Sequence, residues 1–205
     1  MFGSHLYAII DTALAPGPAP LVAEQLLRAG VRVLQYREKG PFTRQSWRDC
    51  CAIAELARNR EVRFIINDRA DVALLCGADG VHLGQEDLPP EHARRLLGEG
   101  KIIGFSTHSV EQAREADGLL VDYLAIGPVF PTVTKEGAHP AVGLETVRAA
   151  RAAVRKPLVA IGGITLENAA AVIEAGADAV AVIRDLLLAP DLEARARQFL
   201  ERLAG

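Results

Sequence analysis

The sequence predicts a single domain over residues 1–205 with the fold of a (βα)₈ barrel. Eight short apolar, β-branched runs alternate with longer amphipathic stretches, and such alternation is typical of a parallel sheet with helical crossovers. A recurring turn supports closure of the sheet, because residues 29–31, 77–80 and 176–179 each join a helical stretch to the next apolar run. Every α/β protein uses such turns, so an open, doubly wound sheet is the alternative fold.

The periodicity of the apolar residues defines the expected elements. Strands are expected at residues 6–10, 31–36, 63–66, 80–83, 102–105, 123–126, 158–161 and 179–182. Amphipathic stretches at residues 22–29, 47–58 and 144–154 are expected among the connecting helices. The longer connection at residues 129–143 is expected to be a lid or binding loop, or else a tolerated surface insertion.

The composition of the chain bears on whether it binds nucleic acid or a membrane. The chain has 205 residues and a formal net charge of −3, so there is no overall basic field and we expect no nucleic acid partner. No apolar run reaches the roughly 18 residues of a membrane helix, and residues 1–10 lack the pattern of a secretory signal. We therefore expect a cytoplasmic protein that acts on small molecules, and a homo-oligomer is left open.

Active sites of such barrels form at the carboxyl ends of the strands, so the polar residues that follow each apolar run are the candidates. After the second run, alternation places Gln35, Arg37 and Lys39 on the same side of the strand. A guanidinium and an ammonium group beside an amide suit a phosphate-bearing substrate. The alternative is a charge cluster on the surface.

Two carboxylates follow the third and fourth strands, namely Asp68, next to Asn67, and Asp87. Magnesium prefers oxygen ligands and commonly takes one or two carboxylates together with substrate phosphates. Asp68 and Asp87 are therefore the predicted magnesium ligands, whereas Glu86 is expected to point away. The alternative for each aspartate is a helix cap.

The fifth strand leads into Ser106, which is expected to hydrogen-bond a heterocycle or a phosphate. Ser109 is expected to cap the following helix. His108 has either a structural or a chemical role, and His82 is expected to pack inside the barrel.

The other side of the rim has the features of an anion site. Thr132, Thr134 and Lys135 lie on the long connection after the sixth strand, where they would be able to close over an anion. The loops after the seventh and eighth strands are the usual phosphate site of these barrels. Gly163 lies in the first of them, and Ile183 and Arg184 begin the second.

Taken together, these segments resemble the thiamine phosphate synthase family, also called thiamine-phosphate pyrophosphorylase. The resemblance covers nearly the whole chain. It is carried by residues 35–39, 67–69, 77–87, 104–109, 127–135 and 161–164. It implies a (βα)₈ barrel that joins hydroxymethylpyrimidine pyrophosphate to a thiazole phosphate, with release of pyrophosphate and formation of thiamine phosphate.

The resemblance also implies a role for each candidate residue. Magnesium would be bound by Asp68 and Asp87. Pyrophosphate would be held by Arg37, Lys39, Asn67 and Lys135. The pyrimidine and its surroundings would be contacted by Gln35 and Ser106. The thiazole phosphate would be held by Thr132, Thr134, Gly163, Ile183 and Arg184. Catalysis would depend on Arg37, Lys39, Lys135 and Ser106.

The chain departs from the family pattern at Arg184, where the family usually carries a serine. A backbone N–H contact survives that change, but the hydroxyl does not. Two alternative functions remain on the same barrel. One is a thiazole tautomerase-like isomerase, with His108 as its proton shuttle. The other is a non-catalytic barrel that binds thiazole phosphate or thiamine phosphate. The presence of Asp68, Asp87 and Lys135 favours the synthase.

Overall fold

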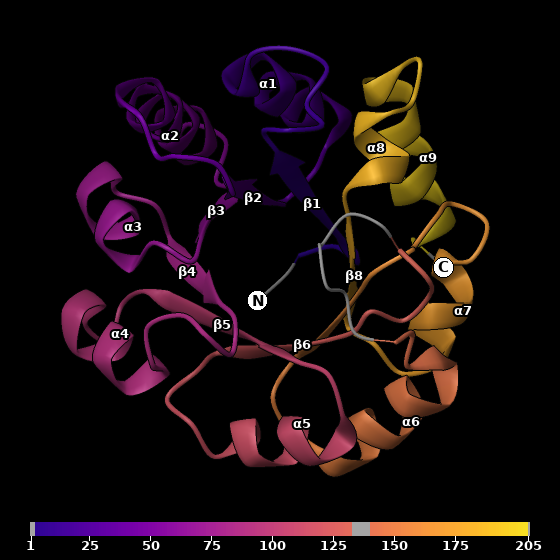
Figure 1. Ribbon diagram of the computed structural model, residues 1–205. Helices are drawn as coiled ribbons and strands as arrows, with labels where there is room; N and C mark the ends of the chain where they lie inside the picture. Colours follow the sequence, from indigo (N-terminus) through magenta and orange to yellow (C-terminus); the bar gives the residue numbers. More distant parts are fainter. Residues whose placement is uncertain (1–2, 133–139, 205) are drawn as a thin grey trace.

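A closed ring of eight parallel strands forms the centre of the computed structural model, which describes residues 3–132 and 140–204 (Figure 1). Neighbouring strands follow one another in chain order, and β1 pairs with β8 to close the ring. The strands are β1 (Leu6–Asp11), β2 (Val33–Arg37), β3 (Arg63–Asn67), β4 (Gly80–Leu83), β5 (Ile102–Thr107), β6 (Tyr123–Ile126), β7 (Leu158–Ile161) and β8 (Ala179–Val182). The barrel prediction is confirmed, and the open sheet is wrong.

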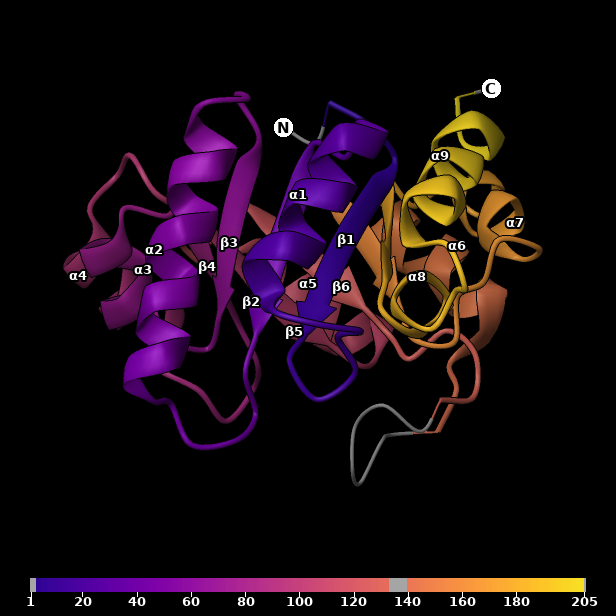
Figure 2. The ribbon, with the colours of Figure 1, turned by 90° about the horizontal axis from the view of Figure 1, so that it is seen from above.

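Helices surround the ring and cover the outer face of the strands (Figure 1). They are α1 (Ala19–Ala29), α2 (Arg44–Arg58), α3 (Ala70–Cys76), α4 (Pro90–Leu97), α5 (Val110–Asp117), α6 (Gly143–Ala153), α7 (Ala169–Glu174), α8 (Arg184–Leu187) and α9 (Leu192–Arg202). Figure 2 shows the barrel from the side, with α1 and α2 lying along the strands and β1 running towards the lower end of the view. The carboxyl ends of the parallel strands therefore share that end.

Several strands continue beyond the apolar runs that predicted them. The additional residues are polar, and they include Asp11, Arg37, Asn67 and Thr107. The backbone ladder pairs N–H with C=O groups whatever the side chain is, so pairing continues where apolar character stops. Polar side chains at the rim are thus held on regular strand, which is more rigid than a loop.

Apolar side chains form two layers that the strands separate. The outer layer packs between strands and helices and includes Leu6, Ala8 and Ile10 of β1. The inner layer fills the barrel, and we call it the lumen cluster: Tyr7, Ile9, Val33, Ile65, Tyr123, Ala125, Val159, Ala179 and Ala181. Successive residues of a strand point to opposite faces, so the alternation along β1 assigns each residue to one layer.

The amino ends of β4, β6 and β8 share one device, which we call the aspartate clamps. An aspartate directly before each of these strands accepts a backbone N–H from the preceding strand and also pairs with an arginine. The three clamps are Asp79 with Phe64 N (2.8 Å) and Arg63, Asp122 with Ile103 N (2.7 Å) and Arg94, and Asp178 with Leu158 N (2.8 Å) and Arg151. Each clamp ties two neighbouring strands together at the end opposite the candidate site.

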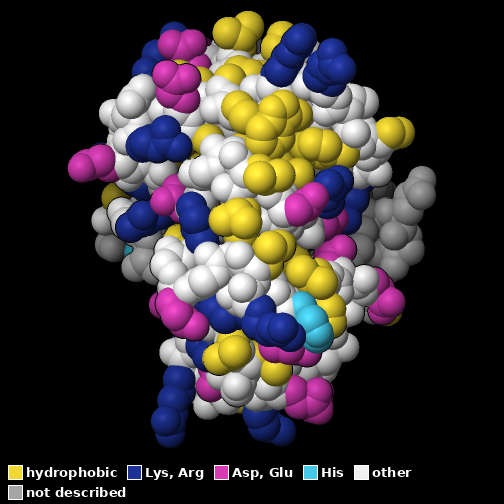
Figure 3. Space-filling model, turned by 90° about the vertical axis from the view of Figure 1, so that its left-hand side faces the viewer, with side chains coloured by type: hydrophobic (Ala, Val, Ile, Leu, Met, Phe, Trp, Pro, Cys, Tyr) yellow, Lys and Arg dark blue, Asp and Glu magenta, His cyan; other side chains and the backbone are white. Residues whose placement is uncertain are grey.

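The side of the molecule that carries α3 and α4 exposes several leucines. Leu74 and Leu75 belong to α3 and Leu96 belongs to α4. Figure 3 shows this side, where hydrophobic side chains gather in one area and positive and negative side chains are interspersed around it. This face thus has no continuous field of one sign. Among the residues that the structure describes, no helix is long and apolar enough to span a bilayer.

Candidate functional site

A pocket of about 720 Å³ opens at the carboxyl ends of the strands and reaches down into the barrel. That volume lies within the range of roughly 300–1,000 Å³ that small-molecule sites occupy. Its floor belongs to the lumen cluster and includes Tyr7, Ile9, Ala125, Val159 and Ala181. The two alanines are small, so the floor leaves space for a flat apolar group between the strands.

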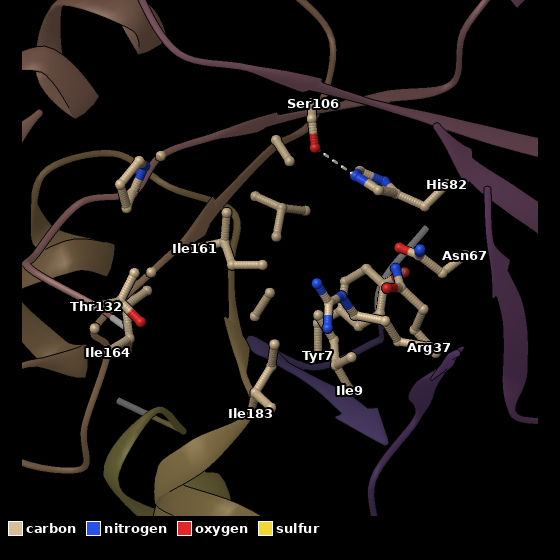
Figure 4. A pocket seen from close by; sticks show the side chains of 18 of the residues that line it. Tyr7, Ile9, Arg37, Asn67, His82, Ser106, Thr132, Ile161, Ile164 and Ile183 are labelled. Carbon is tan, nitrogen blue, oxygen red and sulfur yellow. Dashed lines mark hydrogen bonds between the residues drawn. The ribbon is translucent and has the colours of Figure 1, made fainter. Parts of the chain in front are cut away.

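The wall of the pocket is polar on one side and mainly apolar on the other. Figure 4 shows Arg37, Asn67, His82 and Ser106 on one side, from strands β2 to β5. The opposite side carries Thr132 and the isoleucines of the later strands and loops, which are Ile161, Ile164 and Ile183. Arg184 and Asp185 also line the pocket, from the loop after β8, so charged groups are not confined to the side of β2 to β5.

Three side chains from β2 and its end line the pocket as alternation predicts, namely Gln35, Arg37 and Lys39. The Arg37 guanidinium donates from Nη1 to the buried carboxylate of Asp11 at the end of β1. Lys39 Nζ donates to Asp68 Oδ2 over 2.5 Å. Both cations are therefore held at the rim by carboxylates.

Asp68 and Asp87 lie close together on the pocket wall. Burial raises the pKa of Asp87 above its ordinary value, and the hydrogen bond and negative charge of Asp68 raise it further. Neither carboxylate caps a helix, because Arg69 and Pro89 hold the cap positions of α3 and α4. The cap alternative is therefore wrong for both residues.

This pair of carboxylates fits a magnesium ion. Two adjacent oxygen-donor groups with like charge repel each other, and a divalent cation between them removes that repulsion. Each carboxylate is also anchored from outside the pair, Asp68 by Lys39 Nζ and Asp87 by Gly84 N at 2.7 Å. Asp87 and Asp68 hydrogen-bond to each other as well, so the two groups face one another. Asp68 also holds a left-handed backbone conformation, with φ of 63°, at the turn out of β3.

The side-chain amide of Asn67 has one buried polar atom that bears on ligand binding. Its Nδ2 is buried and makes no hydrogen bond to any residue that the structure describes. An unsatisfied buried donor costs about 1–3 kcal/mol, so a ligand acceptor at this point would be favoured. Asn67 lines the pocket beside the Asp68 carboxylate, where the predicted pyrophosphate would supply that acceptor.

A chain of hydrogen bonds crosses the barrel beneath the rim, and we call it the lumen chain. Its members come from five strands and are Gln35, Tyr7, Tyr123, His82 and Ser106. The links are Gln35 Nε2 to Tyr7 Oη (2.8 Å), Tyr7 Oη to Tyr123 Oη (3.0 Å), Tyr123 Oη to His82 Nδ1 (2.9 Å) and His82 Nε2 to Ser106 Oγ (2.8 Å). Figure 4 marks the last link. Hydrogen bonds between neighbours thereby hold each of these five side chains in place.

Burial raises the pKa of Tyr7 and of Tyr123, so both remain neutral phenols that can donate and accept hydrogen bonds. His82 lies inside the barrel, as predicted, and its ring stacks on Tyr123. The prediction that Ser109 caps α5 is also confirmed, because its Oγ accepts Gln112 N at 3.2 Å. His108 lines the pocket, and its Nδ1 lies 2.7 Å from the Gly127 carbonyl.

The loop after β7 approaches the loop after β6 closely. Gly162 and Gly163 have φ of 101° and 64°, and a Cβ on Gly163 would lie 2.7 Å from Phe130 Cβ. Only glycine allows the two loops to approach this closely. Gly163 also lines the pocket. The same side of the rim carries Thr132, Ile183 and Arg184, which all line the pocket. Thr134 and Lys135, which the sequence also predicts here, lie outside the described residues.

The sequence did not single out three residues of the site. Asp11 follows the first apolar run directly, so the rule that found Gln35 and Arg37 would have found it as well. Tyr7 and Tyr123 are 116 positions apart and read as ordinary core residues. Only closure of the barrel brings their hydroxyl groups together.

A closed barrel with cations, paired carboxylates and a glycine loop at one rim defines a phosphate-binding barrel of the (βα)₈ class. Comparison with known proteins gives the family. The sequence model of thiamine monophosphate synthase matches residues 6–186. The chain therefore belongs to the thiamine monophosphate synthase family, and it is an enzyme of the transferase class.

Curated relatives agree over nearly the whole chain. The thiamine-phosphate synthase of Koribacter versatilis is 48% identical, over 97% of this chain and 95% of the relative. That of Methanospirillum hungatei is 44% identical, over 96% of both chains. Among solved structures, a thiamine phosphate pyrophosphorylase from Pyrococcus furiosus has a TM-score of 0.89 at 37% identity, over 97% of this chain and 95% of that one. A more distant structure, described as native KDPGal, has a TM-score of 0.77 at 19% identity and shows the fold alone.

The lumen chain generates a stability prediction. Tyr7→Phe and Tyr123→Phe should each lower the free energy of unfolding by about 1–3 kcal/mol, because each change leaves a buried polar neighbour without its partner. The double variant should lose less than the sum, because the two hydroxyl groups share one hydrogen bond. Urea unfolding measures all three values.

Tyr36→Phe, on the outer face of β2, is the control and should combine additively with Tyr7→Phe. Additive losses for Tyr7 and Tyr123 would contradict the coupling.

Proposed function

We propose that this pocket joins hydroxymethylpyrimidine pyrophosphate to a thiazole phosphate, which gives thiamine phosphate and pyrophosphate. The observation that carries the proposal is the convergence of Arg37, Lys39 and Asn67 with the carboxylates of Asp68 and Asp87 above an apolar floor. The polar group suits a pyrophosphate, and the floor suits the flat pyrimidine to which it is attached. The family assignment agrees with this reaction.

The reaction needs a leaving group to be stabilised more than it needs a base. The bond between the pyrimidine methylene carbon and the pyrophosphate oxygen breaks, and the electron pair leaves with the oxygen. The electron-rich pyrimidine ring spreads the positive charge that remains on the methylene carbon. Arg37 and Lys39 would bind the pyrophosphate as its negative charge grows, and Asn67 Nδ2 would donate to one of its oxygens.

Magnesium, bound by Asp68 and Asp87, would supply further neutralisation of the pyrophosphate charge. The thiazole nitrogen then uses its lone pair to form the new bond to the methylene carbon, so no proton has to be removed. The protein must hold the two rings in the correct relative position. Gln35 and Ser106 are proposed to contact the pyrimidine, since the lumen chain fixes both side chains at the floor of the pocket.

The thiazole phosphate is proposed to bind at the opposite side of the rim. Thr132, the Gly163 backbone and the start of the loop after β8 at Ile183 and Arg184 all line that side. Thr134 and Lys135 are proposed to complete the site from the sequence pattern alone, with Lys135 directed to the pyrophosphate. The phosphates of the two substrates would then lie on opposite sides of the rim, with the two rings between them.

Two other functions on this barrel are less well supported. An isomerase of the thiazole tautomerase kind would not need a pyrophosphate-bound metal, and a non-catalytic barrel would not need to stabilise a leaving group. The pairing of Asp68 with Asp87 favours the synthase over both. The curated relatives also carry the name of the synthase.

The reaction itself is tested by mixing the two phosphorylated precursors with the protein, with and without magnesium. Thiamine phosphate, detected by mass, is expected only when both precursors and magnesium are present. Turnover of the thiazole alone to an isomer would support the isomerase. Binding of thiamine phosphate without any turnover would support the non-catalytic barrel.

The metal assignment predicts the behaviour of Asp87→Ala. Loss of one ligand should lower kcat/KM by roughly a hundredfold or more, since metal stabilisation of the leaving group contributes several kcal/mol. Excess magnesium should restore only part of the activity. Glu86→Ala is the matched control, because Glu86 is the neighbouring carboxylate and does not line the pocket. Wild-type activity and magnesium dependence in Asp87→Ala would refute the assignment.

The departure of this chain at Arg184 gives a separate prediction. Arg184 is exposed and lines the pocket, and its side chain makes no hydrogen bond or ion pair with the residues that the structure describes. Its guanidinium is therefore available for the thiazole phosphate. Arg184→Ser should raise the KM for thiazole phosphate by about tenfold at low salt, and by less at high salt, because exposed charge is screened.

The KM for the pyrimidine pyrophosphate should hardly change in Arg184→Ser, because that substrate is proposed to bind on the other side. Arg197→Ser is the control, since it removes the same charge from α9, away from the pocket. Steady-state kinetics at two salt concentrations measure both constants. An unchanged or lower KM for thiazole phosphate would show that only the backbone acts at Arg184.

A further inference from the structure

Arg37 is paired with a carboxylate that is itself almost completely buried. Asp11 is 3% exposed and lies at the carboxyl end of β1, in register with Arg37 at the end of β2. Its Oδ2 accepts from Arg37 Nη1. A buried charge is costly unless it is paired and hydrogen-bonded. The Asp11 carboxylate therefore needs a cationic partner, and Arg37 is that partner.

Hydrogen bonds other than the one to Arg37 also hold the Asp11 carboxylate in place. Its Oδ1 accepts the backbone N–H of Ala13 at 3.0 Å, and its carbonyl accepts Leu14 N and Ala15 N at 3.0 and 2.9 Å. Thr12 N donates to the Arg37 carbonyl at 3.0 Å, so the backbones of the two strands are tied together at the same level. The carboxylate is therefore a rigid point of attachment.

Arg37 presents the rest of its guanidinium to the pocket. Nη1 is held by Asp11, while Nε and Nη2 make no hydrogen bond within the part of the chain that the structure describes. The side chain lines the pocket (Figure 4). Only 13% of it is exposed. An arginine side chain loses about 2 kcal/mol of rotamer entropy when it is fixed, and here the fold fixes it in advance.

We infer that Asp11 is a positioning residue, which holds the Arg37 guanidinium by one N–H group so that the others face the pyrophosphate of the substrate. This inference rests on the proposed function, since it takes Arg37 as a pyrophosphate ligand. Asp11 does not line the pocket and acts only through Arg37. Its negative charge also keeps the buried part of the site from accumulating positive charge.

A double-mutant cycle tests the inference, with inorganic pyrophosphate and magnesium as the probe. Asp11→Asn keeps the shape and the acceptor for Ala13 N but loses the charge that orients Arg37. The dissociation constant for pyrophosphate, measured by calorimetry, should rise about tenfold, as expected for loss of a charged hydrogen bond. The KM for the pyrimidine pyrophosphate should rise with it, and the KM for thiazole phosphate should not.

The decisive measurement is the same substitution in an Arg37→Gln background. If Asp11 acts through Arg37, Asp11→Asn should then change pyrophosphate binding by less than about twofold. Equal losses in both backgrounds would show a merely structural role and overturn the inference. Tighter binding in Asp11→Asn would overturn it as well, because it would mean that Asp11 acts mainly by repelling the anion.

Asp178→Asn is the matched control. Asp178 likewise receives one arginine and one backbone N–H, but it lies in a clamp at the far end of the barrel. The Asp178→Asn substitution should lower the melting temperature without changing pyrophosphate binding. If Asp11→Asn does not fold, Asp11→Glu takes its place in the cycle, since it keeps the charge and displaces it by one methylene group.

Failure of this inference can be told apart from failure of the proposed function. A wild-type protein that makes no thiamine phosphate from the two precursors would contradict the function, whatever the cycle gives. A wild-type protein that makes it, together with additive losses in the cycle, would contradict only the role of Asp11.

Discussion

Closure of the sheet is the constraint on which the rest of the molecule depends. Pairing of β1 with β8 leaves no free edge and gives every strand two neighbours, so all the carboxyl ends are held in a ring. Alternation then sends every second side chain into the lumen. Residues from the two ends of the chain, such as Gln35 and Ile183, meet across one pocket for this reason alone.

Much of this arrangement is present in the sequence. All eight strands were predicted, because a parallel strand that is buried on both faces needs an unbroken apolar run. The side of β2 that carries Gln35, Arg37 and Lys39 follows from a period of two. The strand ends were predicted less well, because backbone pairing continues through polar residues such as Asp11 and Asn67, where hydrophobicity gives no signal.

The contacts between distant residues could not be predicted from the sequence in the same way. Tyr7 bonds to Tyr123, and Lys39 to Asp68, because barrel closure and strand register bring them together, and neither pair has a local pattern. The carboxylates of Asp68 and Asp87 were expected to meet, but the raised pKa of Asp87 depends on burial, which only packing defines. Two of the cations at the rim, Arg37 and Lys39, thus already have a carboxylate beside them.

The aspartate clamps tie the amino ends of neighbouring strands to one another. In each clamp the carboxylate of Asp79, Asp122 or Asp178 accepts from a backbone N–H of the preceding strand and from an arginine. Local opening of a protein begins where few such bonds hold the backbone. Amide hydrogens near the clamps are therefore expected to exchange with solvent slowly, and those in the loops at the opposite rim faster. We therefore expect the stability to be graded along the axis of the barrel, with the end that admits and releases substrates opening at the lower free energy.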